Sequence, residues 1–126
     1  MSKQRIQLGR SSEELAVDFL KKNGFKIIEC NFRTELGEID IIALENKTVC
    51  FVEVKSRSSL KFGSGFDALL GSKQKQIAKT ALIYLKENNL LDKKARFDVV
   101  SLTGPLGSQK IELIRNAFEL SPSFTY

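Results

Sequence analysis

Two apolar segments joined by a short polar turn constrain the fold of this chain more than any other feature. Residues 37–44 and residues 48–55 are rich in strand-forming side chains, and Asn46-Lys47 between them suits a two-residue turn. We therefore predict an antiparallel hairpin in which Glu45 is paired with Thr48.

Three charged side chains, Asp40, Glu53 and Lys55, interrupt these apolar strands. In the predicted register the numbers of opposed residues add up to 93, so Asp40 lies opposite Glu53. Lys55 follows two residues after Glu53 and shares its face. A four-residue loop gives the same register, whereas a three-residue loop would put Asp40 and Glu53 on opposite faces.

The two opposed carboxylates predict a metal site. At about 5 Å they repel by roughly 3 kcal/mol at an effective dielectric of about 20, and one lysine cannot neutralise both. A divalent cation held by Asp40, Glu53 and the backbone carbonyl of Val54 would do so, and oxygen ligands favour Mg²⁺ or Mn²⁺. The alternative is a structural ion-pair cluster with Lys55, which we weigh less because buried charges rarely add stability.

Periodicity predicts an α/β (α+β) chain with the element order αβββαββ. Ser11 as N-cap and Glu14 three residues later begin a helix at about residues 12–23, which Gly24 ends. The other predicted elements are a helix at about 73–88 and strands at 25–30, 96–102 and 111–117.

Composition narrows the class of protein. A length of 126 residues with 42% hydrophobic residues suits a single domain over 1–126, with its core at about 9–102 and a C-terminal strand and tail at 103–126. We see no signal peptide or membrane span and expect a cytoplasmic protein. The absence of histidine excludes histidine-dependent catalysis. Cys30 and Cys50 are predicted to be reduced core residues.

The positive charge is concentrated beside the predicted site. Residues 55–79 contain six cations and one anion. The net charge of this segment is therefore +5, equal to that of the whole chain. An anionic polymer is the natural partner of such a segment. Lys73 and Lys75 are placed in the first turn of the second helix, where a phosphate would offset their unfavourable interaction with the helix dipole. A solvated helix face is the alternative for Lys75 and Lys79.

The motifs resemble those of the YraN family, bacterial proteins of uncertain function grouped with Holliday-junction-resolvase-like nucleases. Asp40 followed by Glu53-Val54-Lys55 resembles the PD-(D/E)xK signature of restriction-endonuclease-like nucleases, although Ile39 stands where that signature often has proline. The residues that carry the family resemblance are Gly9-Arg10, Glu13, Ala16, Gly24-Phe25, Asn31-Phe32-Arg33, Gly37-Glu38-Ile39-Asp40, Phe51-Val52-Glu53-Val54-Lys55, Arg57, Phe62-Gly63, Lys73, Ala81, Tyr84-Leu85 and Arg96-Phe97-Asp98-Val99-Val100.

This resemblance implies a restriction-endonuclease-like core, in which helices flank a mixed β-sheet. It also implies a Mg²⁺-dependent endonuclease that acts on branched nucleic acid, with DNA favoured over RNA as the substrate. Asp40, Glu53 and Lys55 would be catalytic, and Glu13 would bind a second metal or its water. Two active sites would be needed to resolve a junction, so a homodimer is a candidate assembly. Arg57, Lys61, Lys73 and Lys75 are expected to contact phosphates, which gives affinity with little sequence preference.

Other interpretations stay open for several of these residues. Glu13 in a first helical turn is also stabilising through the helix dipole alone. For Glu38 we favour plain solvent exposure. Asp98 could approach the site from a neighbouring strand, but we favour a plain cross-strand contact with Arg96. For the whole chain, a nucleic-acid-binding protein that does not cut is the main alternative, and a Schiff-base enzyme built on Lys55 is less favoured because it leaves the basic segment unexplained.

Overall fold

The computed structural model describes residues 11–57, 71–105 and 107–119. Seven helices and strands follow one another there in the predicted order αβββαββ, which confirms the α+β class. They are α2 (Ser12–Lys22), β1 (Lys26–Thr34), β2 (Gly37–Glu45), β3 (Thr48–Arg57), α3 (Gly71–Glu87), β4 (Ala95–Thr103) and β5 (Lys110–Phe118).

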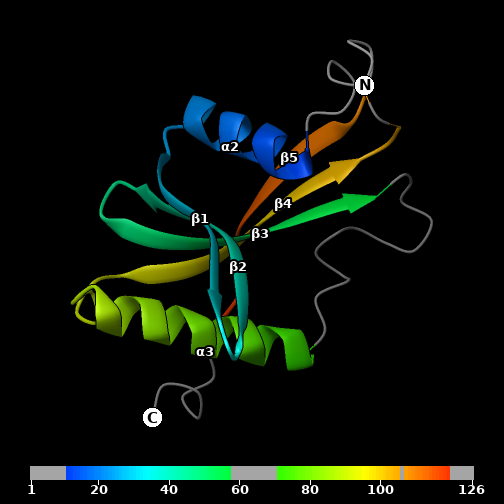
Figure 1. The fold of residues 1–126 in the computed structure, drawn as a ribbon. Coiled ribbons are helices and arrows are strands. Elements are labelled where there is room, and N and C mark those ends of the chain that lie inside the picture. Colours follow the sequence, from blue (N-terminus) through cyan, green and yellow to red (C-terminus); the bar gives the residue numbers. More distant parts are fainter. Residues whose placement is uncertain (1–10, 58–70, 106, 120–126) are drawn as a thin grey trace, which may run out of the picture.

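The five strands form one mixed sheet in the order β1-β2-β3-β4-β5. All neighbouring pairs are antiparallel except β3 and β4, which are parallel. A parallel pair needs a crossover connection, and α3 lies in the chain between these two strands. Helix α2 lies over one face of the sheet and α3 over the other (Figure 1).

Local signals determine where the first helix begins and ends. Ser11 Oγ accepts a hydrogen bond from the Glu14 backbone N–H at 3.1 Å, and Glu14 Oε1 accepts one from the Ser11 N–H at 3.3 Å, which completes the capping box. Gly24 ends the helix with φ +90°, a backbone conformation that favours glycine. The predicted second helix was placed two residues too late, since α3 begins at Gly71. Lys75 therefore lies beyond its first turn, contrary to the prediction.

Each face of the sheet has its own apolar core. The cluster on the α3 side contains Ile39, Phe51 and Val99, and the cluster on the α2 side contains Ile41, Val52 and Val100. Ile39 and Ile41 are two residues apart on one strand and would share a face in a flat sheet. Because they pack on opposite sides, regular alternation is broken between them, at Asp40.

The sheet divides at the same point. Strands β2 and β3 are paired from Glu45 and Thr48 as far as Ile41 and Val52, which confirms the predicted register. Beyond that pair β2 continues with β1 alone and β3 continues with β4. Figure 1 shows the β1–β2 hairpin turning towards α3 while β3 runs on in another direction. Asp40 and Glu53 lie at the fork.

Two further sequence expectations were tested by the structure. Cys50 is buried as predicted, but Cys30 is exposed because it lies on the edge strand β1, most of whose side chains face solvent. Among the helices of the described residues, neither is long and apolar enough to cross a membrane.

Candidate metal centre

Asp40 lies where β2 parts from β3. Its Oδ2 atom accepts a hydrogen bond from the backbone N–H of Val54 at 2.8 Å. The side chain thus takes over a backbone donor at the point where the β2–β3 ladder stops. Burial raises the pKa of the Asp40 carboxyl to about 6, and the charges of Glu53, Glu13 and Glu38 add to this, while the bond from Val54 opposes it.

Three carboxylates from two elements converge beside the fork. Glu13 from the first turn of α2 joins Glu38 and Asp40 from β2, and one oxygen of each lies within 4.8 Å of the others. Glu38 is 41% exposed and also forms an ion pair with Arg33 at 3.1 Å. The expectation that Glu38 faces solvent is therefore correct but incomplete, because it also belongs to the acidic group. Its position two residues before Asp40 was the available signal.

Glu53 has a different environment from Asp40. Its side chain is 8% exposed, and its Oε1 lies 3.0 Å from Lys73 Nζ and 3.5 Å from Lys55 Nζ. Lys73 comes from the first turn of α3, and the sequence had predicted only Lys55 as a partner of Glu53. Burial lowers the pKa of Lys73, but the hydrogen bond and charge of Glu53 outweigh this and raise it.

One pocket joins these groups. Its lining residues are Glu38, Asp40, Glu53, Lys73, Gln76 and Ile77. The carboxylates come from both branches of the fork, and the remaining lining residues come from α3. An open pocket lined by three carboxylates and one lysine offers ligands for a cation and a donor for an anion in one place.

Neither Arg57 nor Lys75 lines this pocket. Arg57 is half-buried at the end of β3, and Lys75 is exposed on α3. Lys61 lies outside the described residues. Asp98 does not line this pocket and forms an ion pair with Arg96 at 2.8 Å, the partner that was predicted. The contact runs along β4 rather than across strands, because both residues lie on that strand.

The donor set fits a hard divalent cation. Glu13, Glu38 and Asp40 offer only oxygen atoms, which are the ligands that such a cation prefers. Burial first, and then the neighbouring glutamate charges, raise the pKa of the Asp40 carboxyl, so its ionised form gains from a nearby cation. Glu53 is already compensated by two lysines. The residues that fit a cation in this arrangement are therefore the three close carboxylates, while Glu53 and the Val54 carbonyl stay predicted ligands.

Fold and site together define an α+β protein with an acidic pocket at a fork in a mixed sheet. The chain belongs to the uncharacterised protein family UPF0102, whose model matches residues 12–102. This confirms the resemblance to the YraN family. A UPF0102 protein of Geobacter metallireducens is 47% identical over 96% of this chain and 99% of its own length. One from Caldicellulosiruptor bescii is 50% identical over 89% of this chain and 97% of its own.

Proposed function

We propose that this chain is a Mg²⁺- or Mn²⁺-dependent endonuclease of the cytoplasm that hydrolyses phosphodiester bonds in branched nucleic acid, DNA in the first instance. The observation that carries the proposal is the pocket that Glu38 and Asp40 share with Glu53 and Lys73. Glu13 joins Glu38 and Asp40 in one acidic group, and Glu53 is paired with Lys55 and Lys73. The resemblance of Asp40, Glu53 and Lys55 to the PD-(D/E)xK signature supports the same reaction.

Each group has a chemical task in this proposal. A divalent cation at Glu13, Glu38 and Asp40 would polarise the scissile phosphate and lower the pKa of a water molecule. Lys55 donates hydrogen bonds that orient the attacking water and stabilise the negative charge growing on the phosphate. In this proposal Lys73 moves from Glu53 to a phosphate oxygen when nucleic acid enters the pocket.

A nucleic-acid-binding protein without nuclease activity is the second candidate. The ion pairs of Glu53 favour it, because Lys55 and Lys73 already neutralise this carboxylate and leave it no need of a metal. The basic side chains on α3 would serve binding equally well.

The two candidates differ in a direct experiment. Crystals soaked in Mn²⁺ at neutral pH are expected to give an anomalous peak among Glu13, Glu38 and Asp40, and the purified protein is expected to cut a four-way DNA junction in Mg²⁺ or Mn²⁺. A junction that is bound but never cut with either ion, together with no anomalous peak, would favour the binding protein.

Lys73 offers a test of the phosphate contact. In Lys73→Gln we expect the slope of log affinity against log salt for duplex DNA to become shallower by about one, since one phosphate contact is lost. Cleavage should fall by about tenfold or more because the same contact stabilises the reacting phosphate. Filter binding over a salt series and a cleavage time course measure the two effects.

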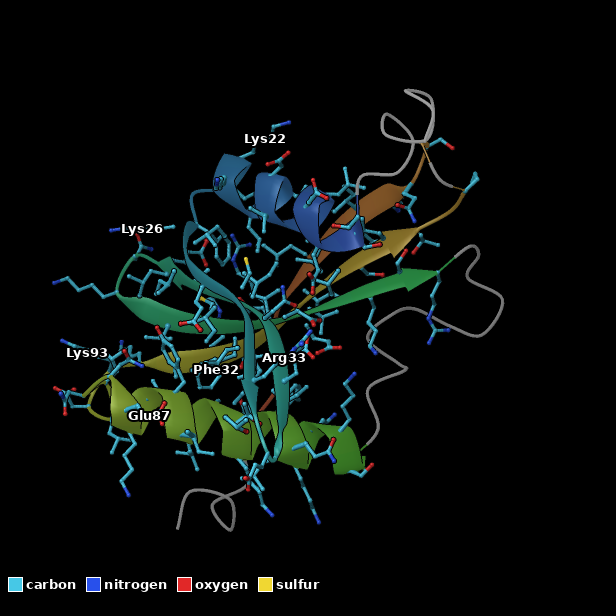
Figure 2. All side chains as sticks on the ribbon, in the orientation of Figure 1. Lys22, Lys26, Phe32, Arg33, Glu87 and Lys93 are labelled. Atoms are coloured by element: carbon cyan, nitrogen blue, oxygen red, sulfur yellow. The ribbon has the colours of Figure 1, made fainter. Side chains whose placement is uncertain are left out.

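The matched control for this variant is Lys93→Gln. Lys93 is exposed beyond the far end of α3 (Figure 2). Its substitution should therefore leave both the salt dependence of binding and the rate of cleavage unchanged. If Lys73→Gln and Lys93→Gln behave alike, Lys73 is a structural partner of Glu53 and does not contact the substrate.

A further inference from the structure

The tip of the β1–β2 hairpin presents an apolar side chain to solvent. Leu36 is 46% exposed, and among the described residues only Ile28 and Leu91 are other large hydrophobic side chains so exposed. The turn around Leu36 is tied down, because its N–H donates to Thr34 Oγ1 at 3.1 Å and this hydroxyl lies 3.5 Å from the Gly37 carbonyl. The exposure of Leu36 is therefore built into a defined turn.

The hairpin is fixed against α3 just behind this tip. A Cβ atom at Gly37 would lie 3.1 Å from Thr80 Oγ1 and 3.5 Å from Gln76 Cβ, so the hairpin approaches the helix closely at this glycine. Phe32 packs edge-on against Tyr84 of α3 with ring centroids 5.2 Å apart. Phe32 and Arg33 leave β1 on opposite sides (Figure 2). The helix thus supports the tip as a rigid projection.

Charge divides this surface into two parts. Helix α3 carries four lysines and no acidic residue before Glu87. Two of them, Lys75 and Lys79, are exposed and are direct neighbours in sequence of Gln76 and Thr80, which contact the hairpin. The tip itself has no cation: it consists of Glu35, an exposed acidic residue that repels phosphates, and the apolar Leu36. Phosphates are therefore attracted to the helix, whereas the tip is suited to an uncharged part of a nucleic acid, its bases.

The spacing relates the tip to the metal centre. A strand rises by about 3.3 Å per residue, so Leu36 lies about 7 Å from Glu38 and about 13 Å from Asp40 along β2. Stacked bases are about 3.4 Å apart along a strand. The tip is therefore about two to four base steps from the carboxylates.

We propose that Leu36 is a wedge that enters the base stack of branched DNA at the branch point, with the phosphates of the adjoining arm on the lysines of α3. This inference rests on the proposed function and deepens it, because it assigns the choice of branched over linear substrate to one side chain. Apolar wedges of this kind unstack a base step, which is easiest where stacking is already interrupted. Cleavage should then fall a few nucleotides from the branch.

Binding without cleavage tests the wedge. In EDTA, a four-way DNA junction and a linear duplex of equal length are titrated with wild type and with Leu36→Ala, and 2-aminopurine at the branch reports unstacking. We expect Leu36→Ala to bind the junction about tenfold more weakly, since a buried leucine side chain contributes about that much. Its affinity for the duplex should not change, and the 2-aminopurine signal should be lost.

The control variant is Leu91→Ala, which removes another exposed leucine, 60% exposed, in the segment after α3. Equal loss of junction and duplex binding in Leu36→Ala, or no loss at all, would overturn the wedge while leaving the proposed nuclease standing. A change only in sedimentation would also overturn it and would make Leu36 a contact between copies. If wild type binds neither DNA, the proposed function fails together with the wedge.

Discussion

Replacing Asp40 by asparagine is expected to reduce metal-dependent cleavage of branched DNA by about a thousandfold or more, because the shared carboxylate of the metal centre is lost. Asparagine has nearly the same shape and keeps an oxygen that can accept the hydrogen bond from Val54. The fork in the sheet should therefore survive. DNA binding in EDTA is expected to stay within about twofold of wild type, because no phosphate-binding cation is removed.

The same substitution should stabilise the protein in the absence of metal. The pKa of Asp40 is about 6 in the folded chain, above its value of about 3.9 when unfolded. The folded state therefore holds the proton more tightly, and ionisation of Asp40 destabilises the fold as the pH rises through 6. In EDTA, Asp40→Asn should be more stable than wild type at pH 8 by up to about 2 kcal/mol, after allowance for screening in the open pocket, and equal to it near pH 4.

Urea unfolding at the two pH values, with and without Mg²⁺, separates the possible outcomes. Saturating Mg²⁺ should stabilise wild type and leave Asp40→Asn unchanged, since only the former binds the ion in the folded state. Asp92→Asn, an exposed aspartate in the turn after α3, is the matched control and should behave as wild type throughout. Undiminished cleavage by Asp40→Asn would refute the proposed metal centre.

Local sequence signals were sufficient for the order of elements and for the hairpin register. Asn46 has φ +56°, a value that asparagine tolerates well, so the two-residue turn could be predicted from its own residues. Glu45 is then paired with Thr48, and the register follows from that pair as far as Ile41 and Val52, where the strands part. The capping box at Ser11 determined the start of α2 in the same way.

Contacts between distant elements could not be predicted from these signals. Alternation along the strands places Glu53 and Lys55 on one face, but it contains no information about where α3 brings Lys73. The approach of Glu13 to Glu38 and Asp40 likewise depends on how α2 packs on the sheet. Cys30 was predicted to be buried because its neighbours are apolar, and it is exposed because β1 is an edge strand.

A second large effect is expected far from the metal centre, at Asp98 on β4. Its side chain is fully buried and accepts hydrogen bonds from Arg96 Nε at 2.8 Å and from the Asn116 N–H at 2.9 Å. Asn116 lies on β5, where the pairing of β4 with β5 shifts register between Phe97 and Val99. This β-bulge removes the Asn116 N–H from the β-ladder, and the Asp98 carboxylate accepts its hydrogen bond instead. Arg96 continues the network to Glu45 on β2.

Loss of this carboxylate should leave buried groups without partners. In Asp98→Ala, the guanidinium of Arg96 keeps only Glu45, and the Asn116 N–H loses its acceptor. Breaking a buried pair in this way costs about 3–5 kcal/mol, a large share of the roughly 5–15 kcal/mol that stabilises a typical domain. We therefore expect a marked fall in the free energy of unfolding, measured by urea titration, with β5 the first strand to lose protection in hydrogen exchange.

Asp92→Ala makes the same chemical change at an exposed site and should cost less than about 0.5 kcal/mol. Asp98→Asn retains the shape and can still accept from Asn116, so its cost should fall between the two alanine variants. A cost for Asp98→Ala as small as that of Asp92→Ala would mean that the network does not hold β5 to the sheet. Because Asp98 lies outside the metal pocket, the surviving folded fraction of Asp98→Ala should bind Mn²⁺ as wild type does, which separates its effect from that of Asp40→Asn.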